Sequence, residues 1–275
     1  VYRLIMKEIP ITQGSLLAPF FTDAYDSCAE AFIQGIMGRG FCDSQTNPTY
    51  GVIQVGDFCI LGGNGDGPLK KNVIHILKTL VNHKSIVMVP LSGSWNQTLT
   101  DSSDFHRVIR YAMDRPSIQY FNKEKLQNYI THVAYDPQYV NESSSRKYIL
   151  RPIDDIFYTE LKKQEWSSDF VSNYNDYSSF EKYGLGYILI EGSTKQILAG
   201  ASSYSTSQDS IEISIATNPA YEGKGFATAA AARFILECIR LGKRPSWDAA
   251  NLTSVHIAEK LGYHLEEEYV AYELN

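Results

Sequence analysis

The segment Ile211–Thr228 constrains the fold of this chain more than any other stretch. It reads Ile-Glu-Ile-Ser-Ile-Ala-Thr, then Asn-Pro-Ala-Tyr-Glu-Gly-Lys-Gly, then Phe-Ala-Thr, which predicts a strand, a glycine-rich turn and the start of a helix. Such a turn exposes backbone N–H groups at the positive end of the helix dipole, and glycine lets the backbone approach an anion without a Cβ clash. The pattern therefore predicts a turn that could hold a pyrophosphate through backbone groups.

The glycine spacing excludes two other phosphate-binding turns. Thr228 stands where a dinucleotide-binding fingerprint needs its third glycine, and no Gly-Lys-Ser/Thr sequence ends the turn as in a P-loop. A plain strand-to-helix turn is the remaining alternative, and we favour the phosphate site over it.

A second segment, Asn251-Leu-Thr-Ser-Val-His-Ile-Ala-Glu-Lys-Leu-Gly-Tyr263, predicts a short capped helix that leads into a last strand. In this order and spacing, the two segments resemble the acyl-CoA site of the GNAT superfamily of N-acetyltransferases. The turn fits the family pattern of Gln or Arg, two residues, Gly, one residue, then Gly or Ala, at Gly225 and Ala227, with Glu222 as a departure in the first position. The resemblance spans residues 147–275 and implies a two-domain bacterial-type member.

The resemblance implies a set of residues that bind acetyl-CoA as a co-substrate, with no metal. A carboxylate at position 222 would repel a pyrophosphate, so we expect its side chain to point away and Lys224 to offset its charge. An amine would attack the thioester directly, without an acyl-enzyme. The implied binding residues are Ile215, Ala216, Thr217, Glu222, Gly223, Lys224, Gly225, Phe226, Ala227, Asn251 and Ser254.

Two side chains are candidates for proton transfer. An amine with a pKa near ~10 is protonated at neutral pH and must lose a proton before it attacks. The resemblance implies Glu212 as the general base, although an alternating strand could equally place it in solvent. It also implies that a strand N–H around Ala216 or Thr217 meets the oxyanion.

The general acid is a second assignment that rests on the resemblance. Ala258 stands where many family members have an acidic Tyr, so Ser254 becomes the substitute that would protonate the thiolate, with His256 and Tyr263 behind it. The plain structural alternatives are a helix N-cap for Asn251, an ordinary first-turn residue for Ser254, an exposed helix position for His256 and a core position for Tyr263.

The order of predicted elements indicates an α+β fold with a GNAT-like mixed sheet flanked by helices. Strands are predicted at 148–151, 186–191, 196–204, 211–217, 244–248 and 268–274, and helices at 154–163, 165–174, after Gly225 to Gly242, and at 251–261. Trp247, Asp248 and the aromatic-rich stretch 170–187 could line an acceptor pocket or simply pack. Residues 136–146 are predicted to be a linker.

Residues 1–135 are predicted to form a separate α+β domain of unknown role. The sequence predicts helices at 28–37, 73–82 and 103–113, a strand pair within 51–61 around Gly56-Asp57, and a strand at 85–91. This order faintly repeats that of the second half, so a degenerate GNAT-like duplicate is one hypothesis.

Composition narrows the class of partner. The charges up to Arg146 balance, so the whole net charge of −6 lies in the remainder, which disfavours nucleic acid and suits a small-molecule amine. The absence of a long apolar run, of a signal-peptide layout and of paired cysteines indicates a cytoplasmic protein that does not bind membranes.

The predicted function is an acetyl-CoA-dependent N-acetyltransferase; the alternative is a non-catalytic acyl-CoA-binding regulatory module. The sequence does not predict an oligomeric state.

Overall fold

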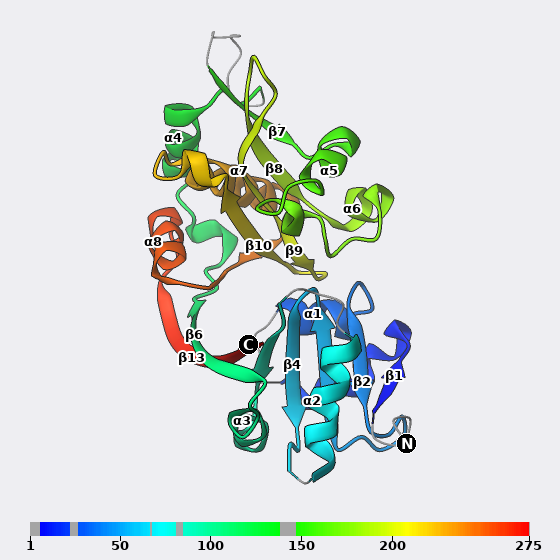
Figure 1. The fold of residues 1–275 in the computed structure, drawn as a ribbon. Coiled ribbons are helices and arrows are strands. Elements are labelled where there is room, and N and C mark those ends of the chain that lie inside the picture. The colour runs from blue at the N-terminus through cyan, green and yellow to red at the C-terminus, as the bar shows by residue number, and fades with distance from the viewer. Residues whose placement is uncertain (1–5, 23–26, 67, 81–84, 138–146, 275) are drawn as a thin grey trace. The chain divides into compact units, whose positions relative to one another are not determined.

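The computed structural model describes residues 6–22, 27–66, 68–80, 85–137 and 147–274. The chain divides into two compact units: residues 1–111 with 268–275 form unit 1, and residues 112–267 form unit 2. The two boundaries fall inside the strands β6 (Phe105–Met113) and β13 (Leu265–Leu274) (Figure 1).

Unit 1 is a mixed sheet with helices against both of its faces. Its strands lie in the order β1-β2-β3-β4-β5-β13-β6; β1 to β4 are antiparallel, β5 is parallel to β4, and β13 is antiparallel to β5. The elements are β1 (Lys7–Ile9), η2 (Ile11–Phe20), α1 (Ser27–Ile33), β2 (Arg39–Cys42), β3 (Tyr50–Val55), β4 (Phe58–Gly63), α2 (Pro68–Leu80), β5 (Val87–Pro90) and α3 (Gly93–Thr100).

The central strand β3 shows why helices pack on both faces of this sheet. All of its residues are buried. Tyr50 packs edge-on against Trp95 of α3, and a Cβ on the next residue, Gly51, would touch Leu17 of η2. Since successive side chains of a strand point to opposite faces, both faces contribute to the core.

Unit 2 contains the strand–turn–helix segment. Its sheet has the order β11-β10-β9-β8-β7, antiparallel from β7 to β10, with β11 parallel to β10. The elements are η3 (Ile118–Tyr120), α4 (Lys123–Val133), β7 (Tyr148–Pro152), α5 (Asp155–Leu161), η4 (Ser168–Phe170), α6 (Tyr177–Tyr183), β8 (Gly186–Glu191), β9 (Ile197–Thr206), β10 (Ser210–Thr217), η5 (Pro219–Tyr221), α7 (Phe226–Leu241), β11 (Arg244–Ser246), β12 (Asp248–Ala249) and α8 (Leu252–Leu261).

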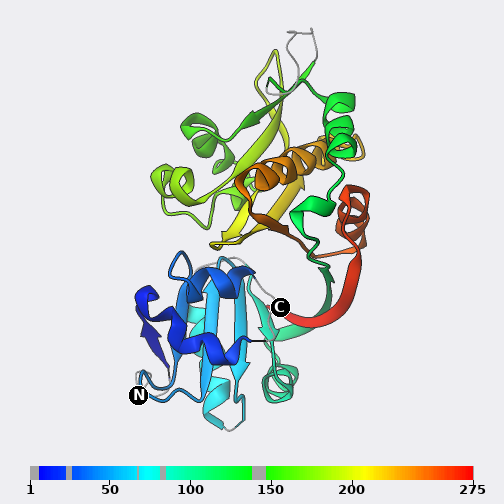
Figure 2. The same ribbon diagram turned by 180° about the vertical axis from the view of Figure 1, so that it is seen from behind.

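Helix α7 lies along the sheet of unit 2 and contacts β8, β9, β10 and β11 (Figure 2). Its run of alanines from 229 to 232 is fully buried, and small side chains permit close packing of the helix. Gly225 precedes the helix and Gly242 ends it, and both have positive φ, at +77° and +70°. The sequence therefore sets both ends of α7 locally.

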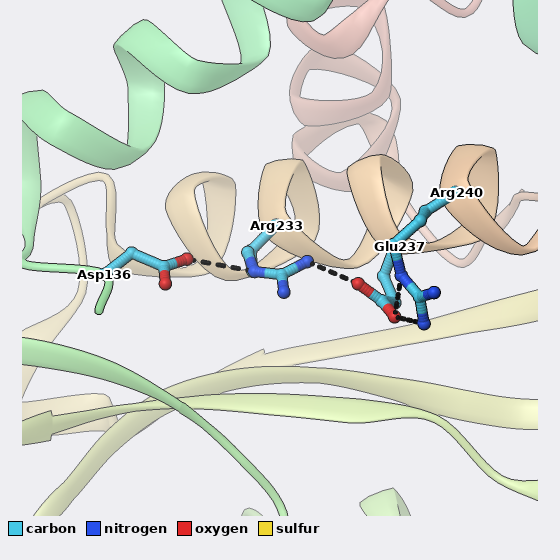
Figure 3. A network of polar contacts seen from close by, with 4 residues as sticks. All are labelled: Asp136, Arg233, Glu237 and Arg240. Carbon is cyan, nitrogen blue, oxygen red and sulfur yellow. Dashed lines mark hydrogen bonds and ion pairs between the residues drawn. The ribbon is translucent and has the colours of Figure 1, made fainter. Parts of the chain in front are cut away.

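A chain of charges, of which Asp136, Arg233 and Glu237 are buried, links α7 to the segment that follows α4 (Figure 3). Arg233 Nε lies 2.9 Å from Asp136 Oδ2, and Arg233 Nη1 lies 3.0 Å from Glu237 Oε2. Arg240 Nε donates to Glu237 Oε1 at 2.8 Å. The Arg233 guanidinium also lies 4.1 Å from the ring centroid of Tyr187 on β8. Burial raises the pKa of Glu237, but the hydrogen bonds from Arg240 and Arg233 outweigh it and hold that pKa below its ordinary value.

Part of the chain path is the same in the two units. In each, antiparallel strands lead into a helix, which returns the chain to a strand parallel to the last one. The path is β3–β4–α2–β5 in unit 1 and β9–β10–α7–β11 in unit 2.

Most of the predicted elements of residues 147–275 are confirmed, with shifts of a few residues at their ends. Three predictions are wrong. Most of the predicted helix 103–113 is the strand β6, from Phe105 to Met113, an extended conformation that suits the β-branched pair Val108-Ile109. The stretch 165–174 contains a single 3-10 turn, η4, and the helix there comes later, as α6. The final strand was assigned to the C-terminal domain, but it pairs with β5 in unit 1.

The division of the chain also differs from the predicted one. The sequence placed a linker at 136–146, of which 138–146 lie outside the described residues, whereas unit 2 begins at Ala112. The physical reason is α4, which the sequence analysis missed: it packs on α7, and the Asp136 that follows it is bound to Arg233. Residues 112–135 therefore belong to unit 2.

Replacement of Arg233 tests the charge network. The side chain of Arg233 is 3% exposed and that of Arg240 60%. Arg233→Met leaves Asp136 and Glu237 without this buried partner, so we expect a loss of about 3–5 kcal/mol in the free energy of unfolding. Arg240→Met is the matched control and should cost less than ~1 kcal/mol. Urea denaturation measures both, and equal losses would contradict the structural role of Arg233.

The pH dependence follows from the lowered pKa of Glu237. A carboxylate whose folded-state pKa is depressed stabilises the fold above its unfolded-state pKa, and this contribution is lost as the pH falls through the folded-state pKa. The stability gap between the wild type and Arg233→Met should therefore be full at neutral pH and shrink below about pH 4.5. A gap that widens on acidification would contradict this sign.

Candidate functional site

The site is built around the point where β10 and β11 separate. Their parallel pairing joins Ser210–Glu212 to Arg244–Ser246 and then ends. Strand β10 continues to Thr217 and keeps its antiparallel partner β9. Within the described part of unit 2, the other edge of β10 has no paired strand beyond Glu212, so its backbone groups are available to a ligand.

The register shows which backbone groups face this open edge. The N–H of Asn218 donates to the Leu198 carbonyl at 2.8 Å, in the same register as the pair Thr217 and Ala199. Hydrogen-bonded positions alternate along an antiparallel strand. The N–H groups of Ile215 and Thr217 therefore face the open edge, and that of Ala216 faces β9. Ala216 and Thr217 were the two residues predicted to donate to the oxyanion. Of these, Thr217 is the one whose N–H points to the open edge.

The turn that follows β10 has room for a ligand. Gly223 and Gly225 adopt φ of +75° and +77°, and a Cβ on Gly223 would meet nothing within 4 Å. On Gly225 it would meet Val133 Cγ2 at 3.9 Å. A non-glycine residue would be strained at either position. The glycines thus permit the conformation and leave the surface of the turn uncovered.

Helix α7 differs from its neighbours in the way it begins. Its N-cap is Gly225, which provides no side chain to accept from the first-turn N–H groups. The N–H groups of Phe226 and Ala227 lie in this first turn, at the positive end of the dipole. In the other helices with described N-caps (α3, α4, α5, α6 and α8), a side chain accepts such a bond: Ser92, Asn122, Asp154, Asp176 and Asn251.

The two charged residues of the turn are both exposed. Lys224 Nζ lies 4.9 Å from the ring centroid of Tyr221, which precedes the turn. Glu222 ends η5 in an extended conformation. Lys224 therefore brings a positive charge to the same turn that carries the unfavourable carboxylate.

Glu212 stands at the point of separation. It is half-buried, and its Oε1 accepts the backbone N–H of Asp248 at 2.7 Å. This bond orients the carboxylate at the start of the open edge. Of the two alternatives from the sequence, solvent exposure or an inward position with a partner, the geometry agrees with the second.

Ser254 lies in the first turn of α8. Its Oγ accepts from the indole Nε1 of Trp247 at 3.0 Å, and its N–H donates to the side chain of Asn251 at 3.0 Å. Asn251 is therefore the N-cap of the helix. Because Trp247 and Asp248 are adjacent, one dipeptide contacts both candidate proton-transfer residues.

The remaining candidates take the structural roles proposed as alternatives. Tyr263 is 1% exposed and donates to the Pro245 carbonyl at 3.2 Å, and burial raises the pKa of its hydroxyl. His256 is exposed on α8 and Ala258 is buried. The aromatic residues of the proposed acceptor pocket are mostly buried in packing contacts: Trp247, Phe170, Tyr174, Phe180 and Tyr187.

A cavity of about 440 Å³ adjoins the turn and was not predicted. Its wall comes from α4, from the turn with the first residues of α7, and from the end of α8. The lining residues are Lys125, Asn128, Tyr129, His132, Val133, Lys224, Gly225, Thr228 and Lys260. The polar start of α4, Asn122-Lys-Glu-Lys, was the available signal, since Asn122 caps the helix.

The described residues give no sign of a metal site, a membrane-spanning helix or a nucleophilic cysteine. Among them, no three His, Cys, Asp or Glu side chains come together as a metal site, and no helix is long and apolar enough to span a membrane. Cys238 on α7 is fully buried, and this burial raises the pKa of its thiol. A buried, protonated thiol is a poor nucleophile.

Unit 2 therefore has a mixed sheet whose strands β10 and β11 separate beside a glycine-rich helix start. Residues 18–272 match the GNAT acetyltransferase family, and the chain belongs to that family. It is 23% identical over 280 residues to the uncharacterized N-acetyltransferase YdfB of Bacillus subtilis (strain 168), with 98% of each chain covered.

Two solved structures are also similar. A GCN5-related N-acetyltransferase-like protein from Streptococcus suis 89/1591 has 29% sequence identity and a TM-score of 0.81, over 97% of this chain and 100% of that one. A tandem GNAT protein from the clavulanic acid biosynthesis pathway shares the fold alone, with 8% identity, a TM-score of 0.56 and 98% of each chain covered.

These relatives establish the activity class. The protein is an N-acetyltransferase, so its acceptor is an amine, and its family uses acetyl-CoA. The non-catalytic regulatory alternative is not favoured. The predicted limits of the resemblance, 147–275, were too narrow, because the family match also includes most of unit 1.

The glycine turn provides a test with a control at the other end of the same helix. Gly225→Ala and Gly242→Ala each force an L-residue to a φ near +70° to +77°, at a cost of about 1–2 kcal/mol in folding stability. Only Gly225→Ala should also weaken the binding of CoA, because residue 225 lies in the proposed phosphate turn, whereas residue 242 lies at the other end of α7. Calorimetric titration and thermal melting separate the two effects. Equal affinity in both variants would argue against the turn.

Proposed function

We propose that the chain transfers the acetyl group of acetyl-CoA to a small-molecule amine at the open edge of β10. One observation carries this proposal: the edge that opens at Glu212 leads directly into the uncapped, positive-φ glycine turn of α7. The pantetheine arm carries amide groups, which can bond to an exposed strand edge. The pyrophosphate has two negative groups, which suit N–H donors at a helix start.

The proposed residues divide the work along this path. Ile215 and Thr217 present N–H groups to the arm and to the oxyanion, with Ala216 between them as backbone. Gly223, Lys224, Gly225, Phe226 and Ala227 hold the pyrophosphate, and Glu222 directs its carboxylate to solvent. Asn251 caps α8 and so fixes Ser254 near the thioester end.

Glu212 is proposed as the general base. It takes a proton from the ammonium form of the acceptor, directly or through a water molecule, so that the neutral amine attacks the acyl carbon. The amide N–H of Asp248 holds the carboxylate in place during this step. A strand N–H stabilises the negative charge that develops on the acyl oxygen.

Ser254 is proposed as the general acid. The Trp247 indole donates to its Oγ, so the serine hydroxyl keeps its own proton to donate elsewhere. The departing thiolate needs one proton to leave as the free thiol. The hydroxyl of Ser254 gives that proton as the C–S bond breaks. The attacking nitrogen then loses its second proton, which returns to the serine oxygen through solvent.

The charge of the chain bears on the class of acceptor. The acidic C-terminal part favours a cationic amine over nucleic acid, and we retain a cytoplasmic enzyme as the proposal. No metal takes part in the proposed reaction.

Unit 1 is proposed to be a separate, degenerate copy of the same fold. Helix α3 packs against its turn between β4 and α2. The Gly65 N–H donates to Ser94 Oγ at 2.8 Å, and a Cβ on Gly65 would lie 2.5 Å from the Trp95 backbone nitrogen. We therefore expect one acetyl-CoA site per chain.

Calorimetric titration with acetyl-CoA and with free CoA tests binding and stoichiometry together. We expect micromolar affinity and one site per chain, because the described part of the unit 1 turn is occupied by α3, whereas the turn of unit 2 is open. Two sites would contradict the closed turn of unit 1. No binding to either ligand would overturn the proposed co-substrate site.

Replacement of Glu212 tests the chemical step. In an assay of thiol release with a panel of amines, Glu212→Gln should lower kcat by about 10²- to 10⁴-fold, the range of a lost general base, with acetyl-CoA affinity unchanged. Glu259→Gln, which replaces an exposed carboxylate on α8, is the control and should retain wild-type rates. Wild-type turnover in Glu212→Gln would exclude this residue as the base.

A further inference from the structure

Two serines lie on either side of Glu212 in the sheet of unit 2. Glu212 of β10 pairs with Ser205 of the antiparallel strand β9 and with Ser246 of the parallel strand β11. Side chains of directly paired residues project from the same face of a sheet, with Cβ atoms about 5 Å apart, the separation of neighbouring strands. The carboxylate therefore stands between two hydroxyl groups in one row across the sheet.

These two hydroxyls differ from others buried in the same sheet. Ser205 is 0% exposed and Ser246 is 1% exposed, and neither Oγ has a hydrogen-bond partner among the described residues. Ser202, which is also on β9 and also fully buried, donates to the Phe170 carbonyl at 2.7 Å. A buried polar group without a partner destabilises a fold, so the two hydroxyls beside Glu212 need an explanation other than stability.

The proton transfer assigned to Glu212 provides that explanation. An ionised carboxylate only accepts hydrogen bonds, but once it has taken a proton one of its oxygens becomes a donor. The Asp248 N–H that bonds to Oε1 can act only as a donor. A serine hydroxyl turns about a single bond, so it can donate to the charged carboxylate and accept from the neutral acid.

Burial shows which kind of role the two serines can have. Since Ser205 and Ser246 have almost no exposed surface, an acceptor molecule does not touch them. Glu212 between them is half-buried. The serines can therefore act on the reaction only through the carboxylate.

We infer that Ser205 and Ser246 are positioning residues for the general base, whose hydroxyls turn toward Glu212 and hold its carboxyl group in both protonation states. A proton passes from the ammonium nitrogen of the acceptor to a Glu212 oxygen, and the electron pair of that N–H bond stays on nitrogen for the attack. The new O–H donates to a serine Oγ, and its proton leaves to solvent after the product departs. This inference rests on the proposed function, in which Glu212 is the base.

The double variant Ser205→Ala/Ser246→Ala tests the inference in the full chain. Because it removes two hydroxyls without partners, it should melt at or above the wild-type temperature. In the assay of thiol release, its kcat should fall about ten- to a hundredfold, because the base is less well oriented, while the affinity for acetyl-CoA is unchanged. Wild-type kcat, or a melting temperature well below that of the wild type, would overturn the inference.

Ser202→Ala is the matched control on the same strand. It removes a buried hydroxyl that has a partner, so it should lower the melting temperature and retain the wild-type kcat. A fall in kcat as large as that of the double variant would show that loss of any buried hydroxyl slows the enzyme, and would overturn the specific role of Ser205 and Ser246.

Coupling to Glu212 separates a positioning role from a structural one. In a Glu212→Gln background, the two serine replacements should cause no further loss of kcat, because the group that they position is already gone. Equal fold-losses in both backgrounds would overturn the inference. Wild-type turnover in Glu212→Gln alone would overturn the proposed base as well, whereas an impaired Glu212→Gln beside a fully active serine variant would overturn only the inference.

Discussion

The separation of β10 from β11 is the feature on which the site depends. The pairing ends at Glu212 and Ser246 because the next residue, Trp247, is held elsewhere. Its side chain is 4% exposed and packs against Tyr263, and its carbonyl accepts the Met113 N–H at 3.2 Å. The same packing presents the indole to Ser254 and the following amide to Glu212. One buried tryptophan therefore opens the edge and orients both candidate proton-transfer residues.

The proposed site needs the start of α7, with its glycine turn, to lie beside the open edge of β10. A helix held by apolar packing alone can slide along a sheet at small cost, whereas a buried charge pair requires one specific geometry. Arg233 bonds to Asp136 and to Glu237 and stacks over Tyr187 on the sheet (Figure 3). We infer that this network fixes α7 both to the sheet and to the segment after α4, and with it the position of the glycine turn and of the cavity wall.

Local signals were sufficient to predict the ends of α7 and α8, since Gly225, Gly242, Gly262 and Asn251 each act within one turn of their own helix. Contacts between distant segments were not predictable in this way. The partner of Glu212 is the amide of Asp248, brought close by the parallel pairing of β10 and β11, and no periodicity encodes it. The cavity was missed for the same reason, because it needs α4, α7 and α8 together.

The two units show that topology alone does not make a site. Both contain a strand, a glycine-bearing turn, a helix and a returning parallel strand. In unit 1 the turn at Gly65 already has partners, because Ser94 and Thr98 of α3 bond to its N–H and carbonyl. In unit 2 the space beside Gly223 is open. In unit 1 the short helix α3 occupies the Gly65 N–H, whereas the turn of unit 2 is where we propose that a ligand binds. If the proposed site is correct, what covers the turn decides function here, and not the fold that forms it.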